Sequence, residues 1–84
     1  MLVFTSKLPP RNNPTFHNWV IVDRIIRANF TPEMKITWGK NGYDGLISLV
    51  PQHFDITRMY RNNEGFITFE FTEEQWAWFL LRWS

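Results

Sequence analysis

The sequence FTEEQWAWFLLRWS, residues 71–84, predicts a strand that passes directly into the last helix of the chain. Thr72 and Gln75 have the spacing of a capping box, in which the Thr hydroxyl accepts from the Gln75 backbone amide and the Gln side chain reaches back. Phe71 and Trp76 are spaced as a hydrophobic staple around this cap. At about 100° per residue, one stripe of the helix is suited to cover a sheet. This stripe carries Trp76, Phe79, Leu80 and Trp83.

The opposite side of this helix is unusually apolar. Trp78 and Leu81 lie roughly 140–200° away from Trp76 around the helix axis. In one interpretation they are core residues, covered by the N-terminal strand, the proline-containing loop or the first helix. In the other they form an exposed patch that binds another chain, because Trp is enriched among the residues that contribute most to interfaces. The candidate partner-binding residues are then Trp78, Leu81 and Arg82.

The middle of the chain carries a hairpin signal. The dipeptide Asn41-Gly42 favours a type I′ turn between two antiparallel strands. Pairing the flanking residues about this turn separates apolar from polar side chains, as a half-buried hairpin requires. The apolar face would consist of Met34, Ile36, Trp38, Ile47 and Leu49.

A similar pattern returns twenty residues later, where Ile56-Thr57 echoes Ile36-Thr37 and Gly65 echoes Gly45. It predicts a second hairpin with its turn near Arg61-Asn62-Asn63. The echo is either an internal repeat or the likeness of any two hairpins of equal length, and both give the same architecture. The apolar face of this hairpin would consist of Phe54, Ile56, Ile67, Phe69 and Phe71.

The N-terminal part adds a short strand and a helix. Residues 1–5 favour a strand, and the proline- and asparagine-rich residues 6–13 favour a loop. Asn13-Pro14 is typical of a helix start, and the apolar spacing that follows continues to about Asn29. The β-branched residues 19–22 leave a strand as the alternative.

Together these elements predict an α+β fold with a four- to five-stranded antiparallel sheet and two helices. The sheet consists of two consecutive hairpins, possibly extended by the N-terminal strand, and the C-terminal helix packs across its apolar face. A chain of 84 residues, 44% of them hydrophobic, is expected to form a single domain, residues 1–84.

Composition excludes several functional classes. A net charge of +1 argues against a general nucleic-acid coat, which carries a marked basic excess. The chain has no cysteine, so disulfides and thiolate chemistry are excluded. The N-terminus does not resemble a signal peptide, and no apolar stretch reaches about 18 residues. We therefore expect a cytoplasmic protein without a membrane partner.

Catalysis is not expected either. His17 and His53 are the only imidazoles, and neither has a partner at the spacing of a metal site. The chain contains no nucleophile elbow, phosphate-binding loop or dinucleotide fingerprint. We predict no catalytic residues, no metal and no cofactor.

The expected function is therefore that of a small non-catalytic binding protein, which occludes a macromolecular partner, above all a protein. By size and composition, though by no motif, the chain is similar to the small proteins with which phages disable host machinery, including anti-CRISPR and anti-restriction inhibitors. A structural subunit, or a homodimer whose second copy covers Trp78, is a further alternative.

A binder of single-stranded nucleic acid is the second hypothesis, because aromatic rings beside cations at hairpin tips can stack bases. Asp44 and Glu64 in the same turns oppose a phosphate backbone. Arg58 has another interpretation, in which its stem packs on the apolar face while its charged end stays in water. The candidate nucleic-acid-binding residues are Trp38, Lys40, Tyr43, Arg58, Tyr60 and Arg61.

Overall fold

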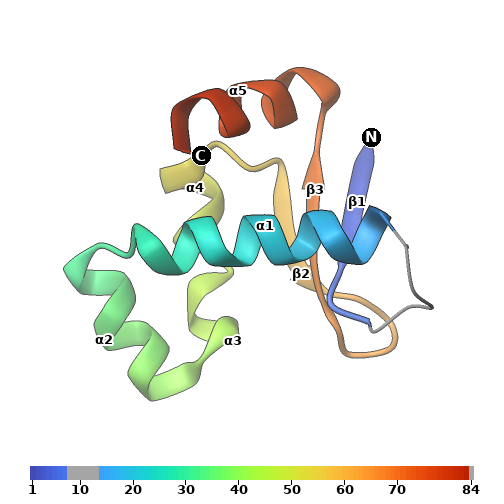
Figure 1. Cartoon of the computed structure of the whole chain (residues 1–84). Helices are drawn as coiled ribbons and strands as arrows, with labels where there is room; N and C mark the ends of the chain where they lie inside the picture. The colour runs from blue at the N-terminus through green and yellow to red at the C-terminus, as the bar shows by residue number, and fades with distance from the viewer. Residues whose placement is uncertain (8–13, 84) are drawn as a thin grey trace.

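The computed structural model describes residues 1–7 and 14–83, which form three strands and five helices (Figure 1). In chain order they are β1 (Leu2–Thr5), α1 (Pro14–Ala28), α2 (Pro32–Asn41), α3 (Tyr43–Leu46), α4 (Val50–Phe54), β2 (Arg58–Arg61), β3 (Ile67–Phe71) and α5 (Glu73–Trp83). Most of the predicted loop at residues 6–13, including the expected helix cap Asn13, lies outside the described residues. In the part of the chain that is described, no helix has the length and apolar character needed to cross a membrane.

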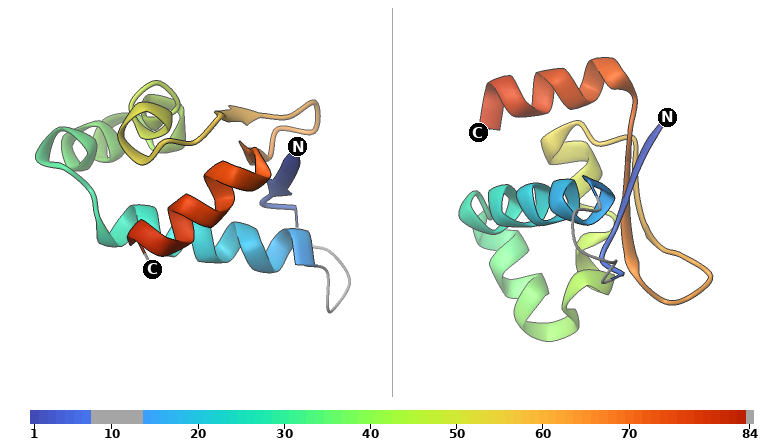
Figure 2. Two further views of the ribbon diagram at one scale, coloured as in Figure 1. Left: turned by 90° about the horizontal axis from the view of Figure 1, so that it is seen from above. Right: turned by 45° about the vertical axis from the view of Figure 1, so that its right-hand side comes forward.

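The sheet has the strand order β1-β3-β2, and both outer strands run antiparallel to β3. Phe69 of β3 lies opposite Phe4 of β1 and Met59 of β2, so these three side chains share one face. All three are buried. The helices lie on this side of the sheet, and among the described residues no helix covers the other face (Figure 2).

Helix α1 closes the core against the sheet. The helix predicted from Asn13-Pro14 is confirmed, and the alternative strand at residues 19–22 is wrong. The Trp19 ring centre lies 6.1 Å from that of Phe69. Ile26, two turns further along the same side of the helix, is buried.

The expected four- to five-stranded sheet with two helices is wrong, because the first predicted hairpin is helical. Residues 32–54 contain α2, α3 and α4. The Thr31 hydroxyl caps α2 by accepting a hydrogen bond from the Met34 backbone N–H at 3.2 Å. Gly42 ends α2 at φ 61°, and its N–H donates to the Trp38 carbonyl at 2.9 Å. The Asn-Gly pair therefore ends a helix instead of turning a hairpin.

The apolar pattern that favoured the hairpin also fits a helix. Met34 and Trp38 are four residues apart, so they share a helix face as well as a strand face. Met34 is buried and Trp38 is half-buried. Ile36, which the hairpin would place beside them, is 62% exposed. The exposure of Ile36 therefore fits the helical period of 3.6 residues and not the strand period of two.

The second predicted hairpin exists, but its pairing is displaced by an odd number of residues from the expected register, because Arg61 and not Ile56 lies opposite Ile67. The chain forms α4 up to Phe54, leaves it at Asp55 with φ 59°, and enters β2 only at Arg58. Because side chains alternate between the two faces of a strand, any odd shift reverses the face of every side chain. Met59 therefore points into the core, while Arg58 and Tyr60 lie on the outer face of the sheet. The interpretation of Arg58 as a cation on the apolar face is wrong.

The loop of this hairpin, residues 62–66, is held by hydrogen bonds to the side chain of its first residue, Asn62. Asn62 Oδ1 accepts hydrogen bonds from the backbone N–H of Glu64 at 2.9 Å and of Phe66 at 3.0 Å. Gly65 has φ 86°, in the left-handed region that favours glycine. The turn lies at the expected place in the chain and extends a few residues further.

Candidate interaction surface on helix α5

Helix α5 begins where the sequence predicts, at a capping box directly after β3. The Gln75 backbone N–H donates to the Thr72 hydroxyl at 3.0 Å, and the Thr72 backbone N–H donates to Gln75 Oε1 at 3.3 Å. The rings of Phe71 and Trp76 form the predicted staple, with their centres 5.1 Å apart. Thr72 alone joins strand and helix, so β3 determines where α5 starts.

The inner side of α5 is packed into the core. Phe79 is buried. The Trp76 ring lies 4.8 Å from that of Phe4 in β1, and the Trp83 ring lies 4.8 Å from that of Phe54 in α4. These contacts at both ends hold the helix in place and determine which of its side chains face outward.

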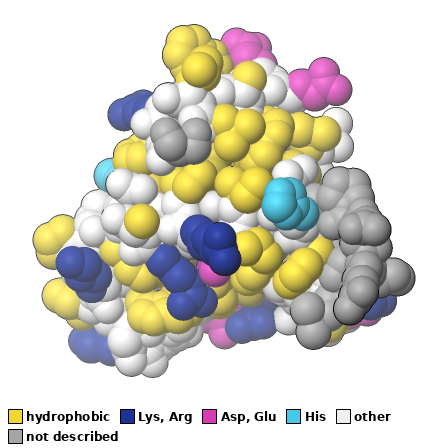
Figure 3. All heavy atoms as spheres, in the orientation of Figure 1, with side chains coloured by type: hydrophobic (Ala, Val, Ile, Leu, Met, Phe, Trp, Pro, Cys, Tyr) yellow, Lys and Arg dark blue, Asp and Glu magenta, His cyan; other side chains and the backbone are white. Residues whose placement is uncertain are grey.

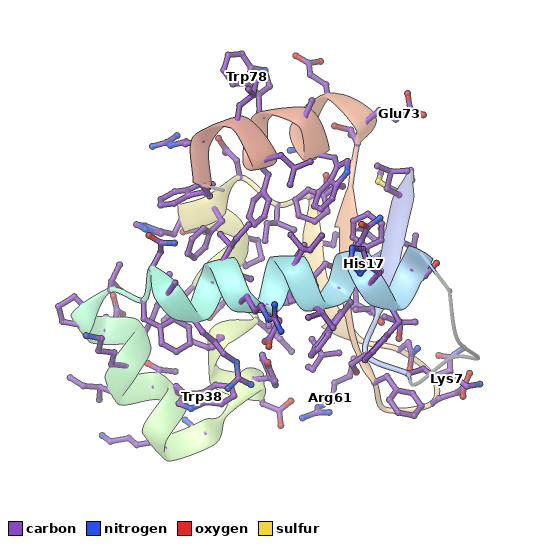
Figure 4. All side chains as sticks on the ribbon, in the orientation of Figure 1. Lys7, His17, Trp38, Arg61, Glu73 and Trp78 are labelled. Carbon is purple, nitrogen blue, oxygen red and sulfur yellow. The ribbon has the colours of Figure 1, made fainter. Side chains whose placement is uncertain are left out.

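The outer side of α5 carries the three predicted partner-binding residues. Trp78 is 62% exposed and Leu81 is 78% exposed, so neither belongs to the core. The Trp78 side chain projects away from the rest of the molecule (Figure 4). Arg82 is also exposed, and its guanidinium carbon lies 5.2 Å from the ring centre of Trp83. The structure brings these residues onto one accessible face, and their role in binding stays a prediction.

Two further residues of this face, Glu74 and Ala77, were not predicted. Both are exposed, and Glu74 lies four residues before Trp78 while Ala77 lies four residues before Leu81, which places them on the same stripe. The helical period could have identified Glu74 and Ala77 from the sequence, because the same period already separated the inner side of α5 from its outer side. Figure 3 shows hydrophobic side chains over α5, with carboxylates at its start and a cation at its end.

The predicted nucleic-acid-binding residues lie in two regions, one on α2 and α3 and one on β2, which meet at the ion pair between Arg61 and Asp44. Trp38 and Lys40 belong to α2, Tyr43 begins α3, and the remaining three belong to β2. Lys40 is exposed in the last turn of its helix. The structure therefore does not bring these residues together as neighbouring hairpin tips.

In the first region, an arginine of α1 covers two aromatic rings. Trp38 and Tyr43 pack edge to face, 4.7 Å apart, and the Arg27 guanidinium carbon lies 4.7 Å from the Trp38 ring centre. Arg27 Nε donates to Asp23 Oδ1 at 3.1 Å, and its Nη2 donates to the Tyr43 hydroxyl at 2.8 Å. Burial, together with the hydrogen bond that the hydroxyl donates to Asp23, raises the pKa of Tyr43 to about 12. This cluster joins α1 to the α2–α3 corner.

In the second region, two ion pairs engage the arginines of β2. The Arg58 guanidinium carbon lies 4.4 Å from the Tyr60 ring centre, and Arg58 Nη1 lies 3.8 Å from Glu70 Oε2. The Tyr60 hydroxyl donates to the same carboxylate at 2.5 Å, which raises the pKa of Tyr60. Arg61 Nε lies 2.6 Å from Asp44 Oδ1 and so connects β2 to α3. These cations are paired with carboxylates of the protein.

The histidines do not form a site with other ligating groups. His17 is exposed on α1 (Figure 4), and the His53 ring lies 5.7 Å from that of Trp83. Among residues 1–7 and 14–83, no three His, Asp or Glu side chains are grouped as a metal site requires. A shallow groove of about 270 Å³ lies between the start of α2 and α4. Its lining residues are Thr31, Glu33, Met34, Leu49, Gln52 and His53.

Comparisons of the chain with protein-family models, with curated proteins and with solved structures gave no match.

Proposed function

We propose that this protein is a non-catalytic binding protein whose recognition surface is the outer face of α5. The observation that carries the proposal is the exposure of Trp78, 62%, on a helix whose other side is packed into the core. Single exposed apolar residues are common on protein surfaces. Trp78, Leu81 and Ala77 are neighbours on one helix face, however, and together they form an apolar patch with a charged rim.

The position of the patch favours binding, because the helix beneath it is already ordered. The capping box at Thr72 and the contacts of Trp76 and Trp83 hold α5 before a partner arrives. A surface that needs little ordering loses less conformational entropy on association. An exposed Trp on such a helix has the size and rigidity of an interface anchor.

A protein fits this face better than a nucleic acid does. Glu73 and Glu74 begin the helix, and Arg82 is the cation of its last turn. The two carboxylates would repel a phosphate backbone. The two arginines of the alternative site, Arg58 and Arg61, are paired with Glu70 and Asp44, which lowers their availability for phosphates, so we do not propose that function.

The proposal assigns no residue a catalytic role and includes a cytoplasmic location. The protein would act by covering the surface of its partner. A phage-type inhibitor of host machinery is one protein of this kind.

Photo-crosslinking tests the proposal. A photoreactive amino acid in place of Leu81 should give a covalent adduct with a protein in the native cell. The same residue in place of Lys35, which is exposed on α2, serves as the matched control and should give no such adduct. Trp78→Ala should abolish the adduct at position 81 while leaving the fold intact. Equal adducts at both positions, or an adduct that is insensitive to Trp78→Ala, would contradict the proposal.

A further inference from the structure

The outer face of α5 has a pattern that is complementary to itself. Glu74, Trp78 and Arg82 follow one another at steps of four residues, so they lie on one stripe with opposite charges at its two ends. Ala77 and Leu81 lie beside this stripe and are exposed as well. The face thus runs from an acid through apolar side chains to a base.

Such a face matches a second copy of itself when the two helices are antiparallel. A twofold axis near Trp78 would bring Glu74 of each copy close to Arg82 of the other copy. The small side chain of Ala77 would leave room for the Trp78 ring of the other copy. A parallel arrangement would instead place like charges next to each other, which is unfavourable.

We infer that the outer face of α5 binds a second copy of this chain, in an antiparallel helix pair centred on Trp78. The inference rests on the proposed function, since it names the partner for the same surface. Within the described residues, neither Glu74 nor Arg82 takes part in an ion pair, and the Arg82 guanidinium beside the Trp83 ring has no carboxylate partner, so a second copy could supply one.

Two properties of the whole molecule permit this pairing. Its net charge is +1, so two copies repel each other little. Helix α5 lies at one end of the molecule with its outer side directed away from the other elements, which allows two copies to approach (Figures 1 and 2).

The pair is expected to be weak. Helix α5 has 11 residues and is therefore only about 16 Å long. A contact between two such helices lies at the small end of specific protein interfaces. We expect a monomer in dilute solution and a dimer at high concentration.

Analytical ultracentrifugation over a wide concentration range tests the inference. The average mass should rise from 10.2 kDa toward twice that value, and the rise should weaken as salt is added. Trp78→Ala should remove the rise. Glu74→Lys or Arg82→Glu alone should shift the midpoint to at least tenfold higher concentration. The double variant should recover most of the association, because each new Lys again faces a new Glu.

Lys35→Glu provides the control, because it changes the net charge as Arg82→Glu does, at an exposed position on α2. Circular dichroism and thermal melts of each variant verify the fold. If a charge reversal unfolds the chain, Glu74→Gln and Arg82→Gln replace it. They should weaken association and abolish its salt dependence. Failure of these variants to do so would overturn the inference.

A mass of one copy at every concentration would overturn the inference. A dimer whose formation is unaffected by both Glu74→Lys and Arg82→Glu would also overturn it, as would a double variant that does not regain association. These results leave the proposed function testable on its own. A Trp78-dependent adduct at position 81 with a different protein would then support the proposed function without self-association. Absence of both the adduct and the dimer would contradict both proposals.

Discussion

Trp76 and Trp78 are two residues apart, yet they occupy opposite environments. The Trp76 ring contacts Phe4 and Phe71 in the core, whereas Trp78 is 62% exposed. The same side chain thus stabilises the fold at one position and is available for binding at the other. The two residues are of the same type, so the difference between them comes from the exposure of their side chains.

Substitution of these two tryptophans should therefore have different effects on stability. Trp76→Ala should lower the free energy of unfolding by roughly 3 kcal/mol, at the low end of the range for truncating an aromatic core residue, because this ring is only partly buried. Trp78→Ala should change it by less than about 0.5 kcal/mol, as is usual at the surface. Denaturant unfolding of both variants measures this difference. Equal destabilisation would show that Trp78 belongs to the core.

A second prediction at this scale concerns Tyr43, whose pKa is raised to about 12 by burial and by its hydrogen bond to Asp23. A raised pKa in the folded state means that the neutral hydroxyl stabilises the fold. This contribution is complete below the ordinary tyrosine pKa of 10.0 and is lost as the pH rises toward 12. The chain has two tyrosines, so Tyr60→Phe leaves Tyr43 as the only one to titrate.

In Tyr60→Phe, the ultraviolet absorbance of the Tyr43 tyrosinate should therefore appear only at a pH well above 10.0, the ordinary tyrosine pKa. Circular dichroism of the same samples shows whether the protein is still folded at each pH. Tyr43→Phe provides the comparison and should lose less stability across this pH range. Titration of Tyr43 near its ordinary pKa in a folded sample would argue against the Asp23–Arg27–Tyr43 cluster.

At the level of the elements, the sequence predicted helices correctly where a helix-start signal, such as a capping box, is compatible with only one structure. The capping box at Thr72 and the Asn-Pro pair before α1 each predicted a helix that is present. The segment at residues 32–54 was predicted wrongly, because its apolar spacing fits both periods and an Asn-Gly pair suits both a turn and a helix end. The cap at Thr31 was the local signal that could have indicated α2.

The candidate site was only partly predictable for a related reason. The helical period placed Trp78 and Leu81 opposite the core side of α5, but their exposure depends on which other elements cover them. That is a property of the tertiary structure. For β2, a register displaced by an odd number of residues moved Arg58 and Tyr60 to the outer face, and the apolar pattern of the strands does not specify this register.

Two glycines test the helical structure of this segment. A Cβ on Gly39 in α2 would have no neighbouring atom within 4 Å, whereas a Cβ on Gly45 would lie 2.3 Å from Thr37 Cγ2. Gly39→Ala should stabilise the protein by about 0.5–1 kcal/mol. Gly45→Ala should destabilise it by about 1–2 kcal/mol through overpacking between α2 and α3. Thermal melts of the two variants provide the comparison.

The control is Thr37→Ser, which removes Cγ2 and should recover part of the stability lost in Gly45→Ala. In the hairpin expected from the sequence, both glycines would lie in strands, and alanine at either position should stabilise. Stabilisation by Gly45→Ala would therefore be inconsistent with the α2–α3 corner.

At the scale of the whole molecule, the outer face of α5 is separate from the packed aromatic core. The helices and β3 enclose one aromatic core, and Arg27 of α1 and both arginines of β2 are paired with carboxylates of the protein. On the outer face of α5, Trp78 and Leu81 are exposed, and among the described residues Glu74 and Arg82 take part in no ion pair. We therefore propose that binding takes place at this end of the molecule.

The most direct test of this claim uses the indole N–H signals of the five tryptophans in an NMR spectrum. Dilute isotope-labelled protein is compared with the same sample after addition of excess unlabelled protein or of native cell extract. We predict that the Trp78 signal shifts or broadens and that the Trp38 signal stays unchanged. In Trp78→Ala, the signals of the other residues of α5 should no longer shift or broaden on this addition. A change at Trp38, or at the backbone amides of Arg58 and Tyr60, with Trp78 unaffected, would contradict the account.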